Sequence, residues 1–209
     1  SMEESLQMAQ YLYNLGYKKI ITTPHVMHDY YKNTPDTIKQ GCTELNEAVA
    51  NAGIPLTIEY AAEYLIDDAF EQKLKNNELL TFGNNHLLIE LSFYNAPHNL
   101  KSILFELQVS GYKVILAHPE RYLYWLNEFH HFEDIKSRDI QFQANLLSFI
   151  GYYSAETRKL LHKMLEADMI DFVGTDFHQP KYIPYYSKVL QSETLYNLIL
   201  SDRLRNHTL

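Results

Sequence analysis

The chain has 209 residues, of which 46% are hydrophobic and 21% charged, enough for one substantial core, so we expect a single domain over residues 1–209. A formal net charge of −8 argues against nucleic-acid binding, and an acidic protein acting on an anionic substrate needs a local positive charge such as a bound metal. One cysteine excludes an internal disulfide framework, and no apolar run approaches roughly 20 residues, so we expect a cytoplasmic protein without membrane insertion.

Helix-like and strand-like segments alternate along the whole chain. Apolar residues at helical spacing, with Thr34 as a cap and Pro35 in the first turn of one segment, predict helices. In chain order these helices cover 6–15, 35–52, 67–79, 100–109, 128–136, 155–167 and 192–204. Short apolar runs predict strands over 19–23, 55–62, 86–89, 113–117, 140–145 and 170–174. Six strand-then-helix units predict parallel strands with crossover helices, in an open sheet or a closed barrel.

A polar side chain of the type that binds metals or substrates stands at the carboxyl end of each predicted strand. These residues are His25, Glu63, Glu90, His118, Asn145, and Asp176 with His178. In a closed barrel all these strand ends meet on one face, where barrel enzymes build their active sites. In an open sheet they would spread along an extended edge, so we interpret the fold as a barrel.

Imidazoles and carboxylates gathered in one mouth predict a metal site. Carboxylates packed together repel one another unless a cation lies between them. Histidine and carboxylate donors without cysteine suit Zn, Mn or Fe, and bridging carboxylates favour a multi-metal site that clamps a phosphoryl group and supplies a metal-bound hydroxide. Asp176 and His178 are two residues apart in an extended segment, so both can point to the same side. Each residue alone could be a solvated loop residue or a helix cap, and only the joint pattern carries the prediction.

Two further residues bear on a phosphatase chemistry. Arg121 could grip a phosphate with two hydrogen bonds, or it could form a surface salt bridge with Glu120 or Glu128. Cys42 lies in a helical pattern, and thiolate phosphatases need an arginine six positions later, where this chain has Ala48. Nucleophilic cysteine catalysis is therefore excluded.

The chain has 17 tyrosines, some of them in adjacent pairs such as Tyr152–Tyr153 and Tyr185–Tyr186. These rings could line a cleft for a phosphorylated aromatic ring, but filling of a barrel rim is the favoured interpretation. The remaining histidines are expected at the surface or in packing: His28, His86, His98, His130, His131, His162 and His207.

Six motifs in this order resemble the PHP (polymerase and histidinol phosphatase) superfamily: ITTPH (21–25), AAEY (61–64), LIELS (88–92), AHPER (117–121), FQANLLS (142–148) and GTDFH (174–178). More narrowly, essentially the whole chain resembles the manganese-dependent protein-tyrosine phosphatases of bacterial capsular and exopolysaccharide gene clusters. This resemblance implies a distorted (β/α)7 TIM-like barrel, the PHP fold, with up to three ions of Mn²⁺, or of Fe, Zn or Mg. It also implies hydrolysis of phosphotyrosine on a partner protein, a bacterial tyrosine kinase whose tyrosine-rich tail controls polysaccharide export.

The resemblance further implies roles for individual residues. His25 and His178 would serve one outer metal together with Glu63, and Asp176 would bind the other outer ion. Among the residues nearer the centre, Glu90 would bridge two metals. His118 would serve the middle metal.

Arg121 would hold the phosphate, and with His118 it would form the catalytic pair. The metal ligands expected from the resemblance are therefore His25, Glu63, Glu90, His118, Asp176 and His178.

One feature of the family has no counterpart here. Members open with a strand that carries a His-x-His pair, followed by an Asp-Asp-Gly turn, whereas residues 3–6 match the segment after it. The first strand and two to three ligands are thus expected to be missing, which would weaken the outer site around Asp176 and lower hydrolysis. Two unpaired strand edges would then favour self-association or strand exchange.

Two other functions are compatible with this sequence. One is a small-molecule phosphomonoesterase of the same superfamily, such as a histidinol-phosphate phosphatase. The other is a truncated, non-catalytic module that binds metal or a kinase tail. Turnover on the two substrate types and the number of metals bound would separate these functions.

Overall fold

Strands and helices alternate in a computed structural model that describes residues 1–209. The strands are β1 Lys19–Thr22, β2 His25–Val26, β3 Thr57–Tyr60, β4 Glu63–Leu65, β5 His86–Glu90, β6 Lys113–Ala117, β7 Gln141–Asn145 and β8 Phe172–Gly174. The α-helices are α1 Met2–Asn14, α2 Pro35–Asn51, α3 Phe70–Lys75, α4 Leu100–Val109, α5 His130–Ser137, α6 Ala155–Glu166, α7 Ile183–Val189 and α8 Glu193–Leu200. Short 3₁₀ turns complete the chain: η1 Pro119–Arg121, η2 Leu123–Trp125, η3 Leu146–Ile150, η4 Pro180–Tyr182 and η5 Asn206–Thr208.

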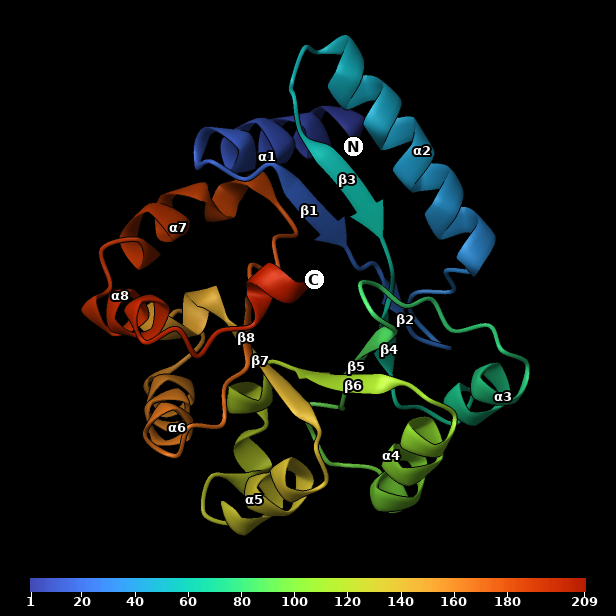
Figure 1. Cartoon of the computed structure of the whole chain (residues 1–209), viewed down its shortest axis with the longest axis vertical. Coiled ribbons are helices and arrows are strands. Elements are labelled where there is room, and N and C mark those ends of the chain that lie inside the picture. The colour runs from blue at the N-terminus through green and yellow to red at the C-terminus, as the bar shows by residue number, and fades with distance from the viewer.

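All strand pairs are parallel, and from β4 to β8 each strand pairs with the next one in the chain. Six strands form one sheet in the order β2-β4-β5-β6-β7-β8, and β1 pairs with β3. The segment of β1 continues into β2 past Pro24, which has no backbone N–H to donate to a ladder. The helices form an outer layer around the strands, with α1 and α2 beside β1 and β3 (Figure 1). The predicted parallel α/β architecture is confirmed.

The ladder of backbone hydrogen bonds ends at β1 and at β8, so the sheet is not seen to close into a barrel. The C-terminal segment lies on the free edge of β8, where Asn206 Nδ2 donates to Val173 O at 2.8 Å and Asn206 Oδ1 accepts from Val173 N at 3.0 Å. Lys19 Nζ, at the start of β1, donates to the backbone oxygen of Leu209 at 3.0 Å. The expectation of two unpaired edges therefore needs correction at β8, because a side-chain amide pairs with the strand there.

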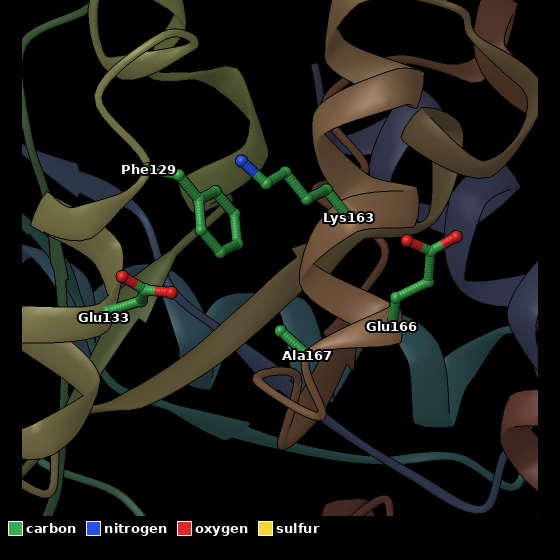
Figure 2. A pocket seen from close by; sticks show the side chains of 5 residues that line it. All are labelled: Phe129, Glu133, Lys163, Glu166 and Ala167. Carbon is green, nitrogen blue, oxygen red and sulfur yellow. The ribbon is translucent and has the colours of Figure 1, made fainter.

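A hollow of about 470 Å³ lies on the outer surface between α5 and α6 (Figure 2). Its lining consists of Phe129, Glu133, Lys163, Glu166 and Ala167. Lys163 Nζ lies 3.9 Å from the centroid of the Phe129 ring. This hollow contains none of the residues that the sequence predicts for the metal site.

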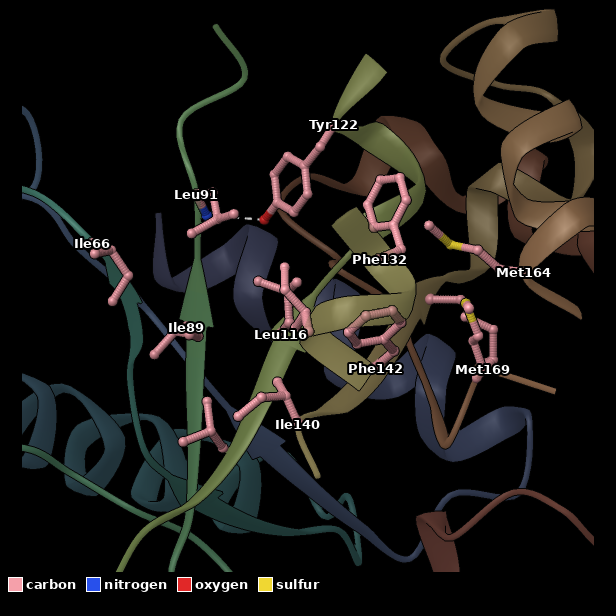
Figure 3. Packing of buried hydrophobic residues seen from close by; sticks show 14 of the residues in the cluster. Ile66, Ile89, Leu91, Leu116, Tyr122, Phe132, Ile140, Phe142, Met164 and Met169 are labelled. Atoms are coloured by element: carbon pink, nitrogen blue, oxygen red, sulfur yellow. Dashed lines mark hydrogen bonds between the residues drawn. The ribbon is translucent and has the colours of Figure 1, made fainter. Parts of the chain in front are cut away.

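The central strands β5 and β6 are buried on both faces. Leu87 and Ile89 belong to the main cluster of 36 buried residues, whereas Leu88 between them belongs to a smaller cluster with Ile115 and Phe172. This division follows from the alternation of side chains along a strand. Figure 3 shows part of the main cluster, in which rings and aliphatic chains from β5, β6, β7, α5 and α6 pack together. The apolar interiors predicted from the sequence are confirmed for these central strands, whereas β1 and β3 have exposed residues.

Most helices begin and end near their predicted positions. Thr34 is the N-cap of α2, and its hydroxyl accepts from Thr37 N at 3.3 Å, as its place before Pro35 predicts. The last predicted helix ends at Leu200 rather than 204, because Asp202 adopts φ +56° and turns the chain. The sequence did not predict α7. No helix combines the length and the apolar character needed to cross a membrane.

Candidate active site

The six predicted metal ligands gather at the carboxyl ends of the strands. Parallel pairing sets His25 of β2 opposite Glu63 of β4, and Leu65 of β4 opposite Glu90 of β5. His118 follows β6 directly, and Asp176 with His178 follows β8. Since parallel strands in one curved sheet end on the same side, residues more than a hundred positions apart come into contact.

Two imidazoles and two carboxylates form the centre of the site. His25 Nδ1 lies 2.8 Å from Glu90 Oε1 and 3.9 Å from Glu63 Oε2. His118 Nε2 lies 3.0 Å from Glu63 Oε1 and 3.7 Å from Glu90 Oε2. Each carboxylate is thus within 4 Å of both imidazoles. The resemblance singled out Glu90 as a bridge, but these distances give Glu63 an equivalent position.

A second group adjoins the centre through His25. His25 Nε2 lies 3.0 Å from His178 Nε2, and the two rings stack with centroids 5.1 Å apart. His178 Nδ1 lies 3.1 Å from Asp176 Oδ1. One donor atom from each of these three residues falls within 4.8 Å of the others. The resemblance implied that Asp176 serves a different ion from the two histidines, whereas here the three side chains lie together.

Arg121 lies beside this second group and not at the outer surface. Its Nη1 is 3.3 Å from Asp176 Oδ2, and its Cζ lies over two aromatic rings, 4.3 Å from the Phe93 centroid and 4.1 Å from the Tyr153 centroid. The alternative of a surface salt bridge with Glu120 is wrong, because Glu120 is fully buried. The expected position of Arg121 at the mouth is consistent with this arrangement.

Asn145 is a site residue that the sequence placed at a strand end without giving it a role. Its Nδ2 donates to Asp176 Oδ2 at 2.7 Å and to Tyr153 Oη at 2.9 Å. Its Oδ1 accepts from Leu147 N at 2.9 Å. Asn145, at the end of β7, therefore holds in place both Asp176 and the Tyr153 ring, which packs against Arg121. The only sequence signal was the asparagine at the end of a predicted strand.

Phe93 and the buried Glu120 were also missed by sequence reasoning. Glu120 Oε1 accepts from Asn145 N at 2.8 Å and from Ser148 Oγ at 2.7 Å. Burial raises the pKa of Glu120, although these two hydrogen bonds oppose the shift. An AHPER motif predicts a turn, but nothing in it distinguishes a buried glutamate from an exposed one. Phe93 has no motif that marks it.

The charged groups of the second group stabilise one another. The hydrogen bond between His178 and Asp176 raises the pKa of His178 to about 9, although burial alone would lower it. Burial opposes ionisation of Asp176, but contact with His178, His118 and Arg121 holds the pKa of this carboxyl below its ordinary value. In the absence of a cation, a proton on His178 neutralises Asp176.

The two central imidazoles behave in the same way. Burial opposes protonation of His118, yet its hydrogen bond with Glu63 leaves the pKa of His118 raised. Burial likewise opposes protonation of His25, and the contact with Glu90 outweighs it, so the pKa of His25 is also raised. Protons therefore occupy positions where a metal would otherwise balance the carboxylates.

The donor set fits a divalent cation. His25 Nδ1 and Glu90 Oε1 are buried and form an ion-pair contact of 2.8 Å, but neither atom has a partner in good hydrogen-bond geometry. His118 Nδ1 is also buried without a hydrogen-bond partner. Buried polar atoms nearly always have a partner, and a bound ion is one explanation for those that lack one. Imidazole and carboxylate donors suit Mn, Fe and Zn.

The chain is similar to known proteins over most of its length. A family model described as "Capsular polysaccharide synthesis, CpsB/CapC" matches residues 1–190. The chain is 28% identical over 205 residues to tyrosine-protein phosphatase YwqE of Bacillus subtilis (strain 168), covering 93% of this chain and 76% of that protein. It is 25% identical over 193 residues to tyrosine-protein phosphatase CpsB of Streptococcus pneumoniae, covering 89% and 79%.

A solved structure has the same fold. It comes from a study described as "Crystal structures of YwqE from Bacillus subtilis and CpsB from Streptococcus pneumoniae, unique metal-dependent tyrosine phosphatases". It superimposes with a TM-score of 0.82 at 27% identity, and the match covers 92% of this chain and 80% of that one. The family match over residues 1–190 includes every strand that contributes to the site.

Proposed function

Because the chain belongs to the CpsB/CapC family of capsular polysaccharide synthesis proteins, we propose that it is a metal-dependent protein-tyrosine phosphatase. The observation that carries this proposal is the placement of the buried His118 and the partly buried His25 within 4 Å of two buried carboxylates, next to an arginine at the mouth. Such a site combines side chains that can coordinate cations with a guanidinium that can bind phosphate. Hydrolysis of a phosphate monoester needs both.

His25, Glu63, Glu90 and His118 are the proposed ligands at the centre. Both carboxylates lie between the two imidazoles, which supports a shared role for Glu63 and Glu90 in neighbouring ions. Divalent cations bound there would supply Lewis acidity and an activated water nucleophile at neutral pH. Of the metals that suit these donors we propose Mn²⁺, with Fe, Zn and Mg as alternatives.

Asp176 and His178 are the proposed ligands of the adjoining position, together with the second nitrogen of His25. Asn145 orients Asp176 by donating to its Oδ2. This second position is more exposed than the centre, since His178 is about half exposed while Glu90 and His118 are buried. The adjoining position should therefore lose its ion more readily.

Arg121 is the proposed phosphate-binding residue. Its guanidinium touches Asp176 through one nitrogen, which leaves other N–H donors for an anionic substrate. Two flanking rings restrict its motion, so less side-chain entropy is lost when it binds phosphate. His118, proposed with Arg121 as catalytic, lies between the two carboxylates, where its Nε2 serves as a ligand rather than as a proton donor to the substrate.

The proposed substrate is phosphotyrosine on a protein. The relatives named as tyrosine-protein phosphatases support this class. The family itself is described by its part in capsular polysaccharide synthesis. We propose a bacterial tyrosine kinase of that process, phosphorylated on its tyrosine-rich tail, as the partner.

The test uses the whole chain, stripped with a chelator and then supplied with Mn²⁺. We expect Mn²⁺-dependent phosphate release from a phosphotyrosyl peptide and much slower release from histidinol phosphate. Glu90→Gln should weaken Mn²⁺ binding at least tenfold and abolish turnover, whereas Glu106→Gln on the exposed surface of α4 should change neither. Faster turnover of histidinol phosphate would instead favour a small-molecule phosphomonoesterase. Metal binding without any turnover would favour a non-catalytic module.

A further inference from the structure

Phe93 is an exposed aromatic residue at the mouth of the site. It lies in the loop after β5, three positions beyond Glu90. Its side chain is 46% exposed, and the adjacent Tyr94 is 89% exposed. The ring is not part of the buried core, so its exposed part is open to contact by a ligand.

The ring of Phe93 lies against the residues proposed to hold phosphate and metal. Arg121 Cζ is 4.3 Å from its centroid, and the His118 ring centroid is 5.5 Å away at an interplanar angle of 35°. Tyr153, the other ring beside Arg121, is tied inward through its hydroxyl to Asn145. Phe93 has no polar group and is therefore the ring of this pair that remains available to a ligand.

We propose that the aryl ring of the substrate packs against Phe93, and that this contact sets a preference for aryl over alkyl phosphate monoesters. The inference rests on the proposed function, because it assumes that phosphate binds at Arg121. Favourable aromatic pairs have centroids roughly 4.5–7 Å apart. A phosphate held by Arg121 lies near Phe93, because the guanidinium carbon is only 4.3 Å from the Phe93 centroid, and the exposed part of that ring is open to an aryl group attached to the phosphate.

A different role for Phe93 would act through Arg121 alone. The ring could hold the guanidinium in place by a cation–π contact, without touching the substrate. Loss of the ring would then weaken every phosphate monoester equally, whatever its alcohol group. The ratio of aryl to alkyl turnover therefore separates the two roles.

The experiment compares the Mn²⁺-loaded chain with Phe93→Leu, which keeps apolar bulk but removes the ring. Substrates are a phosphotyrosyl peptide and a phosphoseryl peptide of otherwise identical sequence. We expect the ratio of their kcat/KM values to fall by roughly 2- to 12-fold, which is the value of one aromatic pair beyond its buried area. Phe105→Ala, a change of a 64% exposed ring on α4, should leave the ratio unaltered. An equal loss on both peptides, or no loss, overturns the inference.

A binding measurement keeps the inference testable without turnover. Phenylphosphonate and methylphosphonate have the same anionic head group, so calorimetric titration of both isolates the contribution of the ring. The advantage of phenylphosphonate should shrink in Phe93→Leu, and an unchanged advantage refutes the role of Phe93. Failure of the proposed function would look different, because the wild-type chain itself would then fail to hydrolyse the phosphotyrosyl peptide.

Discussion

Replacing Tyr122 with Phe should test how the fold fixes the two sides of the site. The Tyr122 hydroxyl accepts from Leu91 N at 2.9 Å, a bond drawn in Figure 3, and donates to Ala117 O at 2.9 Å. Leu91 follows Glu90, and Ala117 precedes His118, so one buried hydroxyl connects the backbone beside two proposed ligands. Tyr122→Phe removes this connection without changing the size of the ring.

The magnitude follows from these contacts. Two lost hydrogen bonds contribute about 1 kcal/mol each, and the buried N–H of Leu91 left without a partner adds about 1 kcal/mol, so the free energy of unfolding should fall by about 2–3 kcal/mol. For a chain of 209 residues this corresponds to a fall in Tm of about 5–10 °C. Urea unfolding followed by circular dichroism measures the change. Tyr94→Phe, at a position 89% exposed, is the matched control and should have no effect. A loss below about 0.5 kcal/mol in Tyr122→Phe would refute the reasoning, because that is the scatter expected of ordinary surface substitutions.

Three further outcomes follow from the site. Glu63→Gln and Glu90→Gln should each weaken Mn²⁺ binding at least tenfold and to similar extents, because both carboxylates lie between the two imidazoles; calorimetry that finds Glu63 dispensable would contradict this. In the metal-free chain, His178 has its pKa raised to about 9 by Asp176, so its contribution to stability should be complete below about pH 6.5 and be lost as pH rises through 9. Since His178 is about half exposed, solvent screening limits this contribution to about 1 kcal/mol, measured as the difference in urea unfolding between wild type and His178→Gln at pH 6 and pH 9.5. Cys42→Ser should leave turnover unchanged, because the buried thiol lies in α2 against Ile58 O; loss of catalysis in a correctly folded variant would contradict the exclusion of a thiolate mechanism.

Much of the architecture could be predicted because local patterns report local structure. The caps and periodicity located most helices, as the observed cap at Thr34 confirms. Alternation of strand and helix predicted the parallel pairing, and the chemistry of strand ends predicted which side chains meet. His25 and Glu63 illustrate this, since they are 38 positions apart in the chain yet lie opposite each other in the β2–β4 register.

The sequence could not predict the contacts made by loops that fold back. Asn206 pairs with β8 through its side chain, and no periodic pattern marks a residue that replaces a strand. Phe93 and Tyr153 meet at Arg121 from loops after β5 and β7, so their proximity depends on the whole curvature of the sheet. Closure of the barrel likewise depends on how β1 and β8 end, which the count of strands does not determine.

Backbone strain at the site indicates which strand holds it together. His118 and Asp176 both adopt left-handed conformations, with φ of +36° and +50°, which cost about 1–3 kcal/mol at residues other than glycine. Such conformations persist only where neighbouring contacts enforce them. His118 N donates to Gln143 O at 2.7 Å, and Asp176 Oδ2 accepts from Asn145 Nδ2 at 2.7 Å. Both restraints come from β7, the strand whose own end provides no proposed metal ligand. That strand therefore serves the site by holding the ligands of its two neighbours, β6 and β8, in conformations that they would not adopt alone.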